Sequence, residues 1–144
     1  MDGILRPVLI IVIAAAGFFA ILALAINLSS ADGDITGDWT VEALVVEGDE
    51  RPPGLGTELT ASFTDGDVNG TAGCNNFFGT YEVDGDSLTI GPLASTEKFC
   101  EDPEGVMEQE LAYLGLLAAA ESYSVSGDLL SITVGEGIEL AFQR

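Results

Sequence analysis

Two cysteines, Cys74 and Cys100, are the residues of this chain best suited to covalent chemistry. They are the only cysteines among 144 residues, and the chain has no histidine. Two thiols without a histidine or a third cysteine do not suggest a metal site, and their spacing is far from the C-x-x-C of a redox pair. In an oxidising compartment they are expected to pair. The disulfide would close a loop of about 26 residues and stabilise the fold by roughly 3 to 4 kcal/mol.

Carboxylates are the second kind of reactive group, and they are abundant: the chain has 24 Asp and Glu residues. The sequence lacks a G-x-S-x-G motif, a P-loop and a Cys–His pair, so most acyl-transfer, phosphoryl-transfer and metal-hydrolysis schemes lose their usual residues. With so many carboxylates, pairs at glycosidase spacing arise by chance. We therefore expect no catalytic residue, no cofactor and no enzymatic activity.

One acidic stretch resembles the opening of a calcium-binding loop. Asp65, Asp67, Asn69 and Gly70 match D-x-D-x-[DN]-G, but position twelve is Asn76 where calcium loops place a bidentate Glu. A β-turn that leads into the next strand explains the same residues. We expect no metal site, and Asp65, Asp67 and Asn69 remain weak candidate ligands.

The segments that must position these residues are mostly short strands. Apolar and polar residues alternate in seven of them. These are Trp39–Val46, Glu58–Phe63, Phe78–Val83, Ser87–Ile90, Tyr123–Ser126, Leu129–Val134 and Ile138–Phe142. Glycine-containing turns at 65–67, 84–86, 126–128 and 135–137 separate several of the strands and suit tight hairpins.

One amphipathic helix is predicted over Asp102–Glu121, with Asp102 as N-cap and Pro103 at the first helical position. Its apolar residues share one arc, which should pack on the sheet. The arc contains Val106, Met107, Leu111, Tyr113, Leu114, Leu117 and Ala118. The expected fold is α+β: a mainly antiparallel β-sheet or partly closed barrel with one packed helix, preceded by an N-terminal transmembrane helix.

Glu110 interrupts this apolar arc, one turn from both Val106 and Leu114. A carboxylate there must reach solvent at the helix edge or find hydrogen-bond donors. In the second case it accepts bonds from backbone N–H groups or from a side chain such as Asn75 or Thr96, which would clamp the helix to a loop. A third reading is a catalytic acid.

The N-terminal part contains an apolar run, Val8–Ile26, without a charged or polar side chain. Its nineteen residues nearly span a bilayer as a helix. Arg6 favours a cytoplasmic N-terminus, so the rest of the chain would lie outside the cytoplasm. We expect residues 1–28 to be a single-pass membrane anchor, 29–36 a short tether and 37–144 the folded domain. The alternative is a long signal peptide, whose cleavage would leave a secreted protein.

The part of the chain after this run is strongly acidic. It has 23 Asp and Glu residues against Arg51, Lys98 and Arg144, a net charge of −20. Nucleic acid and anionic lipid surfaces are repelled by such a domain. The charge suits a saline habitat, and divalent-cation or cationic-partner binding is the alternative.

Several motifs resemble the META domain family, which includes the heat-shock protein HslJ. The similarity follows one order over about 110 residues. It covers Gly37–Leu44, Phe63, Asn69–Ile90 with its G-x-x-G-C-N element, Ala94–Cys100 with Thr96 and Cys100, Met107–Leu117 with Glu108, Glu110, Tyr113 and Leu114, and Tyr123–Ile132. The resemblance implies a small envelope or secreted domain, with some members linked to heat-shock response, antibiotic tolerance or motility, and no known enzymatic class.

We therefore expect a membrane-tethered, extracytoplasmic, non-enzymatic domain with an envelope-stress or protein-interaction role and an envelope protein as its partner. A small-ligand or divalent-cation-binding domain is the alternative.

Overall fold

The computed structural model describes residues 33–144, which form ten β-strands and one α-helix. The helix, α2, spans Val106–Ala118. The strands are β1 Gly37–Val46, β2 Asp49–Arg51, β3 Thr60–Thr64, β4 Asp67–Thr71, β5 Asn76–Asp84, β6 Ser87–Ile90, β7 Ala94–Ser95, β8 Ser122–Ser126, β9 Leu129–Thr133 and β10 Ile138–Gln143.

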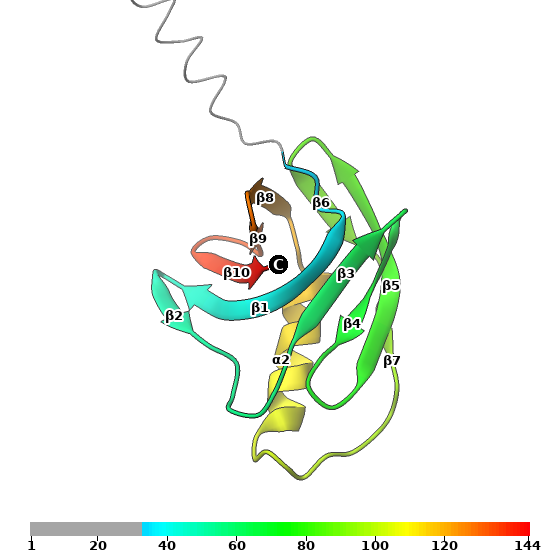
Figure 1. The fold of residues 1–144 in the computed structure, drawn as a ribbon, viewed down its shortest axis with the longest axis vertical. Coiled ribbons are helices and arrows are strands. Elements are labelled where there is room, and N and C mark those ends of the chain that lie inside the picture. The colour runs from blue at the N-terminus through cyan, green and yellow to red at the C-terminus, as the bar shows by residue number, and fades with distance from the viewer. Residues whose placement is uncertain (1–32) are drawn as a thin grey trace, which may run out of the picture. The chain divides into compact units, whose positions relative to one another are not determined.

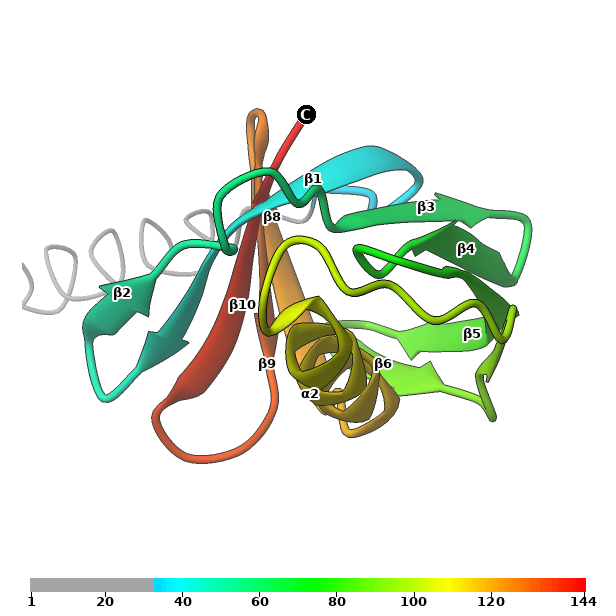
Figure 2. The ribbon, with the colours of Figure 1, turned by 90° about the horizontal axis from the view of Figure 1, so that it is seen from below.

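Eight of the strands close into an antiparallel barrel in the order β1-β3-β4-β5-β6-β8-β9-β10 (Figure 1). The circuit closes because β10 pairs with β1, from Thr40 opposite Gln143 to Val46 opposite Ile138. Strand β2 pairs with the second half of β1, and β7 pairs with β5, so both lie outside the circuit. Figure 2 looks nearly along α2, which packs against the barrel next to β6.

The expected α+β class is therefore wrong. Within residues 33–144 the protein is mainly β, with a closed barrel in place of an open sheet or a partly closed barrel, and the single helix has 13 residues. The physical reason is the β10–β1 pairing, which uses the N–H and C=O groups that would line the edges of an open sheet. The expected transmembrane helix falls outside the described residues.

Large apolar side chains fill the barrel. Trp39, Phe63, Phe77 and Phe142 are each at most 1% exposed. The rings of Phe63 and Tyr81 meet edge to face with centroids 5.0 Å apart, a favourable aromatic geometry. The indole N–H of Trp39 donates to the carbonyl of Ile35, so its polar atom is satisfied in the core. The interior is thus packed with side chains.

All seven predicted strands are confirmed, with ends that shift by one or two residues. The sequence analysis missed β2, β4 and β7. Strand β4 contains one apolar side chain, Val68, and β2 is the charged tripeptide Asp49–Arg51, so neither shows the expected alternation. Backbone pairing with neighbouring strands holds them: β4 pairs with β3 on one side and β5 on the other, and β2, within the described residues, pairs with β1 on one side only.

Two glycine features set the path of β4. The turn before it has positive φ at both Asp65 (51°) and Gly66 (87°), which matches the twist of a tight hairpin. Farther along, a Cβ atom on Gly70 would overlap the Thr60 carbonyl. Only glycine therefore allows β4 to approach β3 so closely at this point.

The helix is shorter than predicted, and its predicted N-cap is wrong. It begins at Val106 after Gly105, whose φ of 83° is left-handed, so Asp102 and Pro103 precede the helix. It ends at Ala118 because Glu121 already bonds to the barrel, donating its N–H to Thr133 and accepting the N–H of Leu88. Leu111, assigned to the packed arc, is 76% exposed.

Candidate functional site

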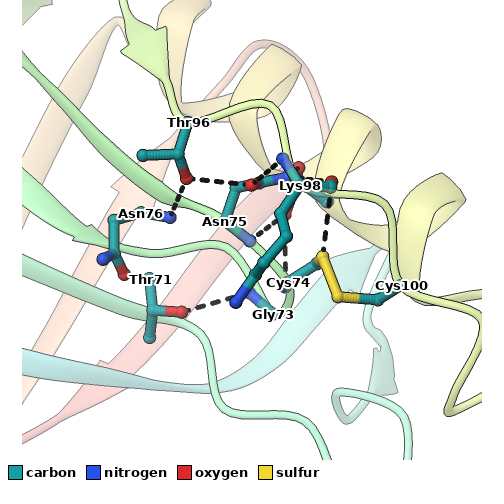
Figure 3. Close-up of a disulfide and its surroundings, with 9 residues drawn as sticks. Thr71, Gly73, Cys74, Asn75, Asn76, Thr96, Lys98 and Cys100 are labelled. Carbon is teal, nitrogen blue, oxygen red and sulfur yellow. Dashed lines mark hydrogen bonds between the residues drawn. A yellow bond between two sulfur atoms is a disulfide. The ribbon is translucent and has the colours of Figure 1, made fainter.

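The loop before β5 is joined to the segment before α2 by the Cys74–Cys100 disulfide. The two Cα atoms are 5.9 Å apart, within the usual range for a disulfide. Figure 3 shows this bond beside the side chains of Asn75, Thr96 and Lys98. The structure thus contains the expected disulfide, and no cysteine is free in the described part of the chain.

The carboxylate of Glu110 points from α2 into this loop and is 6% exposed. One oxygen, Oε2, accepts the backbone N–H groups of Asn75 at 2.7 Å and Cys74 at 3.2 Å. The other, Oε1, accepts the side-chain amide of Asn75 at 2.7 Å. Glu110 therefore does not reach solvent at the helix edge. Its negative charge is held by three donors, which offset much of the cost of burying it.

Asn75 continues this network from Glu110 to the segment before the disulfide. Its Nδ2 also donates to the Lys98 carbonyl at 2.9 Å, and its Oδ1 accepts Thr96 Oγ1 at 2.8 Å and the Lys98 N–H at 2.7 Å. Asn75 is 2% exposed, and the donors and acceptors of its amide are all used. Its amide links α2 to the 96–98 segment.

The predicted clamp residues Asn75, Thr96 and Glu110 are therefore brought together, with Asn75 in the middle and Thr96 bonded to Asn75 but not to Glu110. Every buried side-chain polar atom in residues 33–144 has a partner. A buried carboxylate whose two oxygens are both occupied by donors favours a structural role over an acid–base role.

The candidate calcium ligands are arranged differently from a calcium loop. Asp65 lies in the β3–β4 turn, while Asp67 and Asn69 lie on β4, an extended strand paired with β3 and β5. Val68, between them, points into the core, so Asp67 and Asn69 lie on the outer face. A calcium loop wraps around its ion, which an extended strand cannot do. Among the described residues, no three Asp, Glu, Cys or His residues are grouped so that they could hold a metal ion.

We predict that calcium gives no specific stabilisation. A site filled at 100 times its dissociation constant would add about 2.7 kcal/mol to the free energy of unfolding, or roughly 10 °C in melting temperature. We expect the melting temperatures in calcium chloride and in magnesium chloride at equal ionic strength to agree within about 1 °C. A rise of several degrees with calcium alone would contradict this result.

Gln109 is a site residue that the sequence analysis did not identify. Its Oε1 accepts the backbone N–H of Gly54 at 2.6 Å, and its Nε2 donates to Thr57 Oγ1 at 2.9 Å. These bonds hold the loop after β2 against α2. Helical periodicity gives no signal for a contact with a loop more than fifty residues earlier in the chain.

Beside this loop lies an apolar pocket of about 120 Å³, between α2, β1 and β10. Its floor is formed by core side chains, including Val41, Tyr113 and Leu140, and Arg51 lines it next to Pro52 and Pro53. Burial raises the pKa of the Tyr113 hydroxyl, which stays protonated and donates to the Thr60 carbonyl. The sequence analysis did not identify this pocket.

A second feature is the outward side of α2 near the disulfide. Phe99 is 75% exposed and Leu111 is 76% exposed. Phe99 and the half-buried Met107 line one shallow hollow with Glu101, Glu104 and Glu108. Leu111 lies one helical turn beyond Met107. We call Phe99, Met107 and Leu111, with these three glutamates as their rim, the Phe99 patch.

Together these features define a small antiparallel β-barrel domain, closed by its first and last strands and joined to one helix by a disulfide and a buried polar network. The protein belongs to the META domain family, which matches residues 33–144. No curated protein matches the chain.

Solved structures of other proteins have a similar fold. An NMR structure of a protein from Burkholderia xenovorans superposes with a TM-score of 0.64 at 24% identity, covering 75% of this chain and 81% of that one. A crystal structure of a DUF4847 family protein from Bacteroides vulgatus gives a TM-score of 0.54 at 15% identity, covering 82% and 96%. At these identities the similarity concerns the fold.

The membrane segment expected at residues 8–26 lies outside the described residues, as do residues 29–32 of the expected 29–36 tether. From Gly33 onward, no helix has both the length and the apolar character needed to cross a bilayer.

Proposed function

We propose that this protein is a membrane-tethered META domain that works outside the cytoplasm as a non-enzymatic protein-interaction module, with a role in envelope stress. The apolar run at residues 8–26 supports the tether, and the Cys74–Cys100 disulfide is consistent with an oxidising compartment. In this proposal the domain binds no nucleic acid because its net charge is strongly negative.

The observation that carries the interaction role is the Phe99 patch. Two large apolar side chains, Phe99 and Leu111, are about three-quarters exposed on a strongly acidic domain. Exposed apolar surface that is rimmed by polar groups is typical of protein contact sites. The three rim glutamates select a partner surface with an apolar centre and Lys or Arg at its edge. A second copy of this chain would bring like charges to the same rim, so the partner is a different protein.

The position of Lys98 allows a direct test. It is the only lysine of the chain, and it precedes Phe99. A membrane-impermeant, amine-reactive crosslinker applied to intact cells reaches Lys98 only if the domain is outside, and it then captures what contacts the patch. We expect one reproducible partner whose crosslinked peptide contains basic and apolar residues.

Variants then test the surface itself. Phe99→Ser combined with Leu111→Ser should reduce the crosslink at least tenfold, because burial of these two side chains supplies the apolar contact. Leu129→Ser is the matched control, since Leu129 is 57% exposed on β9, and it should leave the crosslink unchanged. The proposal would be overturned if the double variant captured the partner as well as the Leu129→Ser control does. It would also be overturned if Lys98 were exposed outside the cell and captured no partner.

A further inference from the structure

The apolar pocket on the other flank of α2 has the properties of a ligand site. Its volume of about 120 Å³ approaches the roughly 150 Å³ of an engineered apolar cavity that binds benzene. Its floor contains Val41, Leu59 and Leu140, which are at most 6% exposed. A small apolar group that entered it would therefore contact the barrel core directly.

Most polar atoms at the pocket are already engaged. Both ends of the Gln109 amide hold the loop after β2, and the Tyr113 hydroxyl donates to Thr60. Arg51 differs from these two residues. Its guanidinium makes no ion pair or side-chain hydrogen bond within residues 33–144, although 22 carboxylates lie in that range. The cationic group that lines the pocket is therefore free to bind a ligand.

We propose that this pocket binds a small monocarboxylic acid, with its apolar group against Val41 and Leu140 and its carboxylate on Arg51. The five N–H donors of a guanidinium form a planar fork that matches a carboxylate. The cavity accommodates a group about the size of a benzene ring or a branched four-carbon chain. The ligand class is thus a short branched or aromatic acid.

The negative charge of the whole domain does not exclude such a ligand. At physiological ionic strength, charges farther than about 8 Å are largely screened, so distant carboxylates contribute little at the pocket. Among the described residues that line the pocket, Arg51 is the only charged one. This inference is independent of the proposed partner, because Arg51 and Ala112 line the pocket whereas Phe99 and Leu111 form the patch.

The test compares phenylacetate with its neutral analogue phenylacetamide. Equilibrium dialysis against the full chain in lipid nanodiscs, with empty nanodiscs as the blank, measures saturable binding of each probe. We expect phenylacetate to bind at least tenfold more tightly. Arg51→Gln should raise the dissociation constant for phenylacetate about tenfold and leave that for phenylacetamide unchanged.

Two further variants complete the design. Ala112→Leu fills the pocket from the exposed side of α2 and should abolish binding of both probes, while the thermal melt shows that the barrel is intact. Arg144→Gln removes an arginine elsewhere and should change neither constant. Equal affinities for the two probes, no saturable binding, or binding unaffected by Ala112→Leu would overturn the proposal. The Lys98 crosslink to the partner protein is expected to remain in Arg51→Gln, Ala112→Leu and Arg144→Gln.

Discussion

Replacing Glu110 with glutamine is expected to lower the free energy of unfolding by about 3 to 5 kcal/mol. Both carboxylate oxygens accept N–H groups, from Cys74 and Asn75. A glutamine has one oxygen, so its NH₂ group would face an N–H donor and leave it unsatisfied at a position that is 6% exposed. At roughly 4 °C per kcal/mol, the melting temperature should fall by more than 10 °C.

Glu104→Gln is the matched control for this experiment. It removes the same charge, but Glu104 is exposed before α2, so the expected change is below about 0.5 kcal/mol. Urea unfolding of both variants separates the role of the buried network from that of net charge. Equal free energies of unfolding would show that the Glu110 contacts do not stabilise the fold.

How far the sequence predicts this site depends on the distance between its parts along the chain. Helical periodicity puts Glu110 among apolar residues, which restricts it to the core or its rim. The choice between solvent and a buried clamp cannot be made from periodicity, because the donors come from a loop 35 residues earlier. The Lys98 backbone groups that complete the network have no side-chain signal at all.

The same reasoning applies to the barrel. Alternating side chains predict strands such as β1 and β10, because each places one face in the core. Closure depends on the pairing of β1 with β10, at opposite ends of the domain, and no local pattern encodes it. This pairing is why the expected α+β class was wrong although its strands were correct.

The errors on α2 have local causes. A proline after an acidic residue predicts a helix start, but the residue before the helix is Gly105, with left-handed φ, three residues after the predicted N-cap Asp102. Leu111 counts as core by residue type, yet it lies beyond the stripe formed by Val106, Glu110 and Tyr113. Residue type alone predicts a buried Leu111 and an exposed Glu110, and the structure has the opposite arrangement.

Removing the disulfide is expected to lower the free energy of unfolding by about 3.5 kcal/mol. Cys74 and Cys100 are 26 positions apart, and in the chain-entropy account a link over that distance restricts the unfolded chain. Cys74→Ser with Cys100→Ser should therefore melt roughly 10 to 15 °C below the oxidised protein. The urea dependence should steepen, because an unlinked chain exposes more surface on unfolding.

The folded barrel should survive this change because the loop keeps its other attachments. Asn75 still bonds to Glu110, Thr96 and Lys98, so near-native circular dichroism is expected for the double variant. Reductant should lower the melting temperature of the natural chain to that of the double variant and should not affect the variant itself. If oxidised and reduced protein melted at the same temperature, the disulfide would not contribute to stability.

The disulfide and Glu110 hold the same loop, so their contributions to stability should be coupled. Combining their substitutions should lower the free energy of unfolding by an amount that differs from the sum of the two separate losses, whereas the losses of independent supports would add.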